Sequence, residues 1–461
     1  MPDYGQRVRY GVGIGGLWLV FMTTAFYLLY YYTDVLGLSG RTAGTILLIA
    51  TLWDAVTDPL MGLLISRTKS RWGAYRPYLI FGAAPMAASF ILVFSGLEAG
   101  NGQIFLFALL SQILFRTLFT IVYIPYTALI ARLSPDANER ASIASVKAFF
   151  TSLGALTVSF YGLPLVARFG AGNDSTGFLL TASLFGAISV LTLMTTGLGV
   201  RETTTAARGQ SATDVEMNNT GGDLSLAQSL HALISNRAFM LVFFGVILFT
   251  GCYTVFNKAT VYFFQYDYGD RDAARYALAA VSIAGLISPF FWAWVTHYRG
   301  KRFVWISGCI LAAVSLLLLY ALNMPELPLP VITGCYFATG CGIQAFLMTF
   351  YTITADAIDY GEWQRGTRPE AIGFGLLSFA NKASLAIGGF VLGWFLDEIG
   401  YVAGREQPAA VLEGIRGLLI FGPVAGFLAS AAVISRFPVT NALHATLVSE
   451  LRKKKLTSAS L

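Results

Sequence analysis

Charged residues are scarce in this sequence, and cysteines and histidines are scarcer still. Only 12% of the 461 residues are charged, with four cysteines and three histidines, whereas 56% are hydrophobic. A soluble protein is about a quarter charged, because polar groups must cover its surface. We therefore exclude a secreted protein, a nucleic-acid-binding protein and an ordinary soluble enzyme.

The few cysteines and histidines are not arranged for chemistry. No metal-type spacing or disulfide framework relates the cysteines, which lie in apolar stretches at Cys252, Cys309, Cys335 and Cys341. The histidines fall in expected loops or in the C-terminal tail, at His231, His297 and His444, so none can serve as a base or ligand inside a membrane. We expect neither a membrane-embedded enzyme nor a tightly bound cofactor or metal. A channel is also unsupported, because no span supplies a ring of equivalent charges.

Apolar segments long enough to cross a bilayer as helices recur along the whole chain. The first set is expected at 10–32, 42–66, 77–97, 103–130, 143–167 and 177–199. The second set is expected at 238–263, 275–296, 303–323, 330–353, 372–396 and 413–435. The chain thus predicts an all-α membrane protein of twelve transmembrane helices in two six-helix halves, which is the architecture of major-facilitator transporters.

The pattern divides the chain into an N-terminal half, a cytoplasmic linker, a C-terminal half and a basic tail, at residues 1–200, 201–236, 237–436 and 437–461. We expect a short amphipathic helix in the linker after Asp223. On the side of the termini, the loops and tails carry 21 lysines and arginines, against 5 on the opposite side. By the positive-inside rule, both termini are cytoplasmic in a multi-pass protein of the cell (inner) membrane.

Two acids lie inside the second span, in TLWDAVTDPLMG. An ionisable group at the bilayer centre costs about 2.5–3.5 kcal/mol on insertion scales, so each is a candidate functional residue. Asp54 and Asp58 are four residues apart and share one helix face. Pro59 frees the carbonyl of Ala55, which adds a third hard oxygen ligand suited to Na⁺ or H⁺. The alternative is a structural ion pair.

The fourth span, FRTLFTIVYIPYTAL, repeats this design. Pro125 frees the carbonyl of Ile121 near the hydroxyl of Thr120. Arg116 lies one turn before Thr120 and at the depth of Asp54, roughly 20 Å into the membrane at 1.5 Å per residue. We expect its guanidinium to bind a carboxylate in bidentate fashion. The alternative is a structural role against the third or tenth helix.

Other residues deep in the spans have two interpretations each. Lys382 is the expected counter-charge from the second half, unless it snorkels to the interface. The same alternatives stay open for Lys258, beside Asn257. Three aromatic residues either stack on a ligand or only pack helices together, namely Trp18, Tyr123 and Tyr126.

Five motifs run over most of the chain: YYYTDVLGLS, WDAVTDPLMG, SRWGAYRP, IPYTAL and ADAIDYGEWQRGTRPEA. Together they resemble the glycoside–pentoside–hexuronide:cation symporters, the melibiose-carrier family. The resemblance implies a secondary transporter that moves a sugar, glycoside or related solute with a cation by alternating access. Its partners would be a small-molecule substrate, a coupling cation (Na⁺ or H⁺) and the lipid bilayer, with no nucleic acid, and it would act as a monomer.

The resemblance also implies roles for individual residues. Asp54, Asp58 and Thr120 would form the cation site, with Thr57 where the family often has an asparagine. Lys382 would lie beside this site and switch between the carboxylates and the occupied site. At the cytoplasmic end, an inner gate would close by salt bridges among Arg140, Asp356, Asp359 and Arg368.

The substrate site departs from that of the sugar-binding members. Those members place aspartates at the positions held here by Trp18 and Tyr123, so a carboxylate grip on sugar hydroxyls is missing. The ligand is therefore expected to be less hydroxylated, or an anion or zwitterion met by Lys258 and Lys382. Because the fourth helix also resembles sodium-dependent lysophospholipid transporters, an amphipathic or anionic solute is the alternative. The expected substrate-binding residues are Lys382, Trp18, Tyr123, Lys258, Tyr126 and Asn257.

The coupling ion follows from the charges beside the aspartates. If Arg116 and Lys382 neutralise Asp54 and Asp58, little net charge is left to hold Na⁺. We therefore expect Na⁺ to stimulate transport weakly or not at all, which leaves proton coupling or facilitated diffusion.

Overall fold

The computed structural model describes residues 4–68, 70–96, 100–133, 137–200 and 226–439, together with 443, 446, 447, 449 and 450. Within this part of the chain the regular structure is helical and no strand is present. Twelve of the helices are long and apolar enough to cross a membrane. The predicted all-α membrane fold with twelve spans is confirmed.

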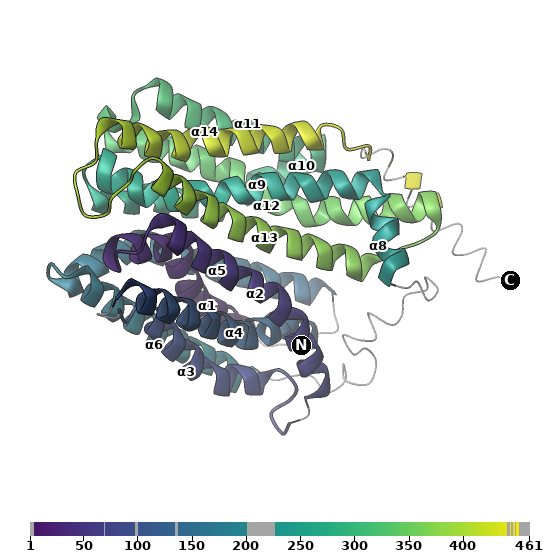
Figure 1. The fold of residues 1–461 in the computed structure, drawn as a ribbon. Coiled ribbons are helices and arrows are strands. Elements are labelled where there is room, and N and C mark those ends of the chain that lie inside the picture. The colour runs from purple at the N-terminus through teal and green to yellow at the C-terminus, as the bar shows by residue number, and fades with distance from the viewer. Residues whose placement is uncertain are drawn as a thin grey trace.

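The helices form two bundles that lie against each other (Figure 1). The N-terminal half, purple to blue, consists of α1 (Tyr4–Tyr30), α2 (Gly40–Arg67), α3 (Arg76–Val93), α4 (Asn101–Leu133), α5 (Ala137–Gly170) and α6 (Asp174–Gly199). The C-terminal half, teal to yellow, consists of α9 (Arg237–Tyr262), α10 (Ala274–Arg299), α11 (Lys301–Ala321), α12 (Leu329–Arg365), α13 (Glu370–Glu398) and α14 (Ala409–Ile434). We call the end that carries Tyr4 and Ile434 the terminal end, and the end that carries Val35 and Glu398 the far end.

One predicted element is confirmed by the structure, and another is longer than predicted. The short helix expected after Asp223 is present as α8 (Leu226–Ile234). The helix expected to end at residue 353 is longer in the structure, because α12 continues to Arg365 and ends at Gly366 with a φ of 73°. Charged residues end an apolar run but not a helix, whose backbone hydrogen bonds are internal. Gly366 ends the helix because glycine adopts this left-handed conformation without strain.

The first helix of each half ends in a π-helical turn that contains an aspartate. These turns are η1 (Tyr31–Val35) and η3 (Phe263–Asp267). Such turns are rare and often lie at functional sites. Asp267 accepts two hydrogen bonds from Arg416 of its own half, at 2.8 and 2.9 Å. Asp34 instead accepts from two hydroxyls of the other half, those of Tyr266 and, at 2.6 Å, Tyr401.

Helices α2 and α13 join the two halves at the far end. Their backbones touch, since a Cβ added to Gly393 would collide with the carbonyl of Gly40. The carboxylate of Asp397 accepts from the amide of Gly40 at 2.6 Å and from that of Arg41 at 2.8 Å. A helix N-terminus has unpaired amides and a positive dipole, so the acid of one half caps the helix of the other.

Candidate functional site

The two acids of α2 lie where the halves face each other. Asp54 is buried, and Arg116 of α4 donates from Nη1 to its Oδ2 at 2.9 Å. The expected bidentate pairing is wrong in its geometry. Oδ1 of Asp54 and Nε of Arg116 are both buried and have no hydrogen-bond partner among the described residues. The pair is therefore held by one charge-assisted hydrogen bond and keeps an unused acceptor.

Asp58 binds groups from both halves. Thr120 of α4 donates to its Oδ1 at 3.0 Å. The ammonium of Lys382 on α13 donates to its Oδ2, so this ion pair bridges the halves within the membrane-spanning region. Asp54 lies near enough to Lys382 to attract its charge as well. The structure thus gathers Asp54, Asp58, Thr120 and Lys382, as expected for a single polar cluster.

Thr57 is placed differently from the rest of the expected cation site. It is buried, and its hydroxyl donates to the carbonyl of Trp53 at 3.2 Å, within α2 itself. Serine and threonine hydroxyls commonly bond back to the preceding turn in helices. The structure shows an additional link that the sequence did not suggest, since the indole of Trp53 donates to Thr117 of α4 at 2.9 Å. This bond holds α2 against α4 at the residues next in sequence to Asp54 and Arg116.

Lys258 of α9 does not snorkel to an interface. It is 8% exposed, and its ammonium donates at 2.8 Å to the carbonyl of Ala25, on α1 of the other half. It is close enough to Arg116 for the two positive charges to repel. The neighbouring Asn257 donates to the carbonyl of Tyr253 at 3.0 Å, while its Oδ1 is buried without a partner among the described residues.

The three aromatic residues expected at the substrate site differ in how deeply they are buried. Trp18 and Tyr123 are half-buried, with ring centroids 6.0 Å apart, and Phe119 stacks on Tyr123 at 5.4 Å. Tyr126 is fully buried and its ring stacks on Tyr10 at 4.7 Å. Tyr126 thus packs α1 against α4, and its contact with substrate stays a prediction.

Gln112 is a functional candidate that the sequence analysis missed. It lies on α4 one turn before Arg116, is completely buried, and neither its amide nitrogen nor its oxygen has a partner among the described residues. Buried side-chain amides are normally hydrogen-bonded. The available signal was a glutamine inside an apolar span, SQILFRT.

Three of the charged residues expected at the inner gate have partners in the C-terminal half. Asp356 accepts from Lys301 of α11 at 2.7 Å, and Arg368 lies 2.9 Å from Asp359. Burial by itself lowers the pKa of Arg368, but hydrogen bonds to Glu362 and Glu370 and the charge of Asp359 raise it above its ordinary value. The pairing of these residues with the half-buried Arg140, as an inner gate, stays a prediction.

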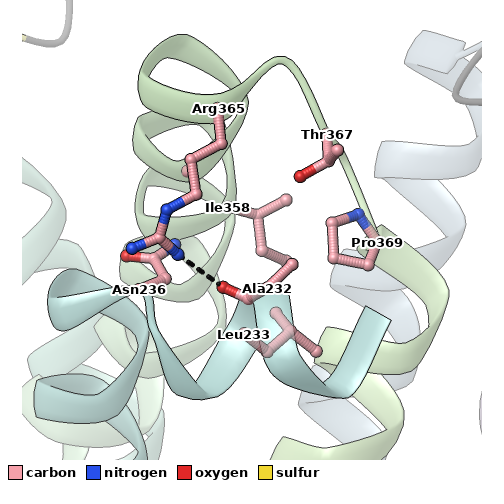
Figure 2. A pocket seen from close by; sticks show the side chains of 8 residues that line it. Ala232, Leu233, Asn236, Ile358, Arg365, Thr367 and Pro369 are labelled. Atoms are coloured by element: carbon pink, nitrogen blue, oxygen red, sulfur yellow. Dashed lines mark hydrogen bonds between the residues drawn. The ribbon is translucent and has the colours of Figure 1, made fainter. Parts of the chain in front are cut away.

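A small pocket at the same end lies between α8 and the end of α12. Figure 2 shows Arg365 reaching over it to the carbonyl of Ala232, at 3.0 Å, with Ile358 and Pro369 on the wall. Apolar side chains, the polar side chains of Asn236 and Thr367, and one arginine bound to main chain line it, and none of the site residues above does. Among the described residues, no three histidine, cysteine, aspartate or glutamate side chains are grouped to hold a metal ion.

Comparison with known proteins places this geometry in context. Residues 9–441 match the family described as MFS/sugar transport protein. The isoprimeverose transporter of Lactiplantibacillus pentosus is 30% identical over 98% of this chain and 92% of its own length. The putative glycoside/cation symporter YagG of Escherichia coli (strain K12) is also 30% identical, over 98% of this chain and 95% of its own.

A solved structure shares the fold. It is a bacterial homolog of the human lysosomal transporter Spinster, in an inward-facing and unoccupied conformation. The TM-score is 0.67 at 15% identity, covering 94% of this chain and 97% of that one. At this identity the likeness shows the arrangement of the helices alone.

Proposed function

Because the chain belongs to the MFS/sugar transport protein family, it is a multi-pass membrane transporter and not an enzyme, and we propose that it carries a sugar, glycoside or related solute together with a cation. The names of the two relatives, an isoprimeverose transporter and a glycoside/cation symporter, support this class of substrate. The observation that carries the proposal is the ion pair between Asp58 and Lys382, which joins the halves at a carboxylate able to bind a cation.

The ion pair suggests how a cation would be coupled to movement. A positive ion on Asp58, whether H⁺ or Na⁺, cancels the charge that holds Lys382. Separating the two groups leaves a carboxylate and an ammonium unpaired at membrane depth, where each is costly, so the halves resist separation until the carboxylate is neutralised. Once it is, α13 is free to move against α2, as alternating access requires.

The contacts at the far end support one direction for the opening. Arg271 of the C-terminal half binds Asp174 at the start of α6 and donates to Tyr30 at 3.2 Å, beside the Asp34 and Asp397 contacts described above. These bonds between the halves close the far end. The excess of basic residues on the terminal side favours placing that side in the cytoplasm. We propose that this conformation is closed toward the outside, with both termini cytoplasmic in the cell membrane.

The coupling ion proposed here is the proton. Sodium prefers several oxygen ligands and a site of net negative charge, whereas Asp54 is already bound to Arg116. An arginine does not lose its proton in proteins, so this neutralisation is permanent. Asp58 alone remains to be neutralised, and one proton does this without further ligands. Facilitated diffusion is the second candidate, favoured by the same arginine.

Uptake into proteoliposomes tests the proposal. Purified protein is reconstituted and given isoprimeverose, xylose and methyl glycosides, with an imposed gradient of H⁺ or of Na⁺. We expect saturable uptake of at least one solute, accelerated by the proton gradient and lost in Asp58→Asn. Gradient-driven uptake that is unchanged in Asp58→Asn would remove the coupling role of this residue. Ionic conductance or a chemically altered solute would replace the symporter by a channel or an enzyme.

A further inference from the structure

The charges in the middle of the molecule do not balance. Two acids and three bases lie together there. Asp54 forms an ion pair with Arg116, and Asp58 forms an ion pair with Lys382. Lys258 is left over. The cluster therefore carries a net charge of about +1 when every group is ionised.

Lys258 has no negative partner in the part of the chain that the structure describes. Its one hydrogen bond to a described residue goes to a neutral carbonyl, that of Ala25, and the like-charged Arg116 lies close enough to repel it. Taking an ammonium out of water without a counter-charge is costly. An anion that enters from outside the protein would supply the missing counter-charge.

Two unsatisfied amides lie at the same depth as this lysine. Asn257 is 10 residues from the far end of η3, and Gln112 is 11 residues from the start of α4. At 1.5 Å per residue both are about 15 Å below the far end, level with Lys258 and Ala25. Asn257 has one unpartnered buried atom and Gln112 has two. The oxygen of Asn257 can accept a hydrogen bond from a hydroxyl of a polar solute, and the amide of Gln112 can both donate and accept.

These groups come from both halves of the molecule, Gln112 from α4 and Asn257 with Lys258 from α9. Gln112 precedes Arg116 by one turn and shares its face of α4, the face that meets Asp54. Asn257 adjoins Lys258 on α9, and Lys258 crosses to α1 of the other half. The arrangement thus lies between the halves, on the far-end side of the two ion pairs.

We propose that Lys258 is the anion-binding residue of the substrate site, and that the transported solute is a hydroxylated monoanion with a carboxylate or sulfonate group. This inference rests on the proposed function and narrows its substrate class. The charge of the solute pairs with Lys258, and its hydroxyls pair with Asn257 and Gln112. A neutral glycoside leaves the lysine unpaired, so the site discriminates against it.

Binding of matched pairs tests the inference in the purified full-length protein. Each pair differs only or chiefly in its charge: methyl β-D-glucuronide with methyl β-D-glucoside, D-galacturonate with D-galactose, and 2,3-dihydroxypropane-1-sulfonate with glycerol. Calorimetry and thermal-shift assays measure affinity. We expect the anion of at least one pair to bind about tenfold or more tightly than its neutral partner, equivalent to 1.4 kcal/mol.

Variants assign the preference to one residue. Lys258→Gln should lose the preference for the anion, and Lys258→Arg should keep most of it. Lys147→Gln is the matched control, because Lys147 is another lysine within a span, half-buried on α5, and the variant should bind like the wild type. A preference that survives in Lys258→Gln overturns the assignment. If Lys258→Gln does not fold, the wild-type pairs and Lys258→Arg still decide the substrate class.

The outcomes separate this inference from the proposed function. If every anion fails to bind at millimolar concentration, or if a neutral member binds as tightly as its anion, the inference is overturned while coupled glycoside transport stands. If the anions bind through Lys258 but no gradient drives their uptake, the symport proposal fails and the anion site stands.

Discussion

Asp54 and Asp58 lie one turn apart on the same helix face, yet they belong to different kinds of ion pair. Asp54 binds Arg116 of its own half, at 2.9 Å, whereas Asp58 binds Lys382 of the opposite half. A pair within one bundle survives when the bundles rock against each other. A pair between bundles must break whenever they separate. The difference identifies Asp58 as the switching carboxylate and Asp54 as part of a fixed frame.

The two π-helical turns repeat this contrast at the far end. Asp267 is bound by Arg416 within the C-terminal half, while Asp34 reaches two tyrosines across the interface. The residue of α6 that corresponds to Arg416, seven positions after the helix start, is Thr181. No arginine therefore competes for Asp34 from that position. The π-helical turn of the C-terminal half is therefore bound within its own half, whereas the turn of the N-terminal half binds the opposite half.

The largest effect is expected from Asp58→Asn. The amide cannot hold Lys382 as an ion pair or bind a proton, so coupled uptake should fall by roughly tenfold or more, equivalent to about 1.4 kcal/mol in the activation free energy. Initial rates of uptake in proteoliposomes measure this, and size-exclusion profiles check that the variant is folded. Wild-type rates in a folded variant would show that the bridging pair is not the switch.

When both charges of a pair are removed, the pair of Asp54 with Arg116 should respond differently from the pair of Asp58 with Lys382. Asp54→Asn alone leaves Arg116 buried without its acid, so we expect coupled uptake to be lost. The double variant Asp54→Asn with Arg116→Gln restores neutrality and should recover part of the fold stability and of downhill transport. The corresponding double variant at Asp58 and Lys382 should recover stability without coupling. Equal behaviour of the two double variants would remove the distinction between frame and switch.

The dependence of uptake on Na⁺ tests the role of the pair between Asp54 and Arg116. In the wild type, external Na⁺ at constant pH should change the uptake rate by less than about twofold, because Arg116 already neutralises Asp54. Arg116→Gly leaves both oxygens of Asp54 without a partner, so the uptake rate should become dependent on Na⁺. Strong Na⁺ stimulation of the wild type would contradict this assignment. Titration of uptake against NaCl, with choline chloride as the control salt, measures it.

The smallest effect is expected at the contacts between Asp34 and the two tyrosines of the opposite half. Asp267→Asn breaks two charge-assisted bonds inside one half and should lower the thermal stability. Asp34→Asn breaks bonds between the halves, so it should leave the melting temperature nearly unchanged and increase the population that is open at the far end. Spin labels at the exposed Phe169 and Val402, on a cysteine-free background, report the separation. An unchanged distance distribution in Asp34→Asn would show that the tyrosine contacts do not hold this end closed.

Length and hydropathy alone predicted the twelve spans and the short helix after Asp223, because each depends on a local run of residues. The shared face of Asp54 and Asp58 also followed from local spacing. The continuation of α12 to Arg365 did not, since a helix leaving the membrane loses its apolar signal but keeps its hydrogen bonds.

The partners of the charged residues were decided by tertiary structure. Which base binds which acid depends on the register and rotation of α4 and α13 against α2, and residues 62 and 324 positions apart in sequence set these contacts. The same holds for Lys258, whose burial against Ala25 requires α9 and α1 to cross. Local sequence determines which groups stand on a helix face. The packing of the two halves determines whether that face meets a charge, a carbonyl or an unfilled site.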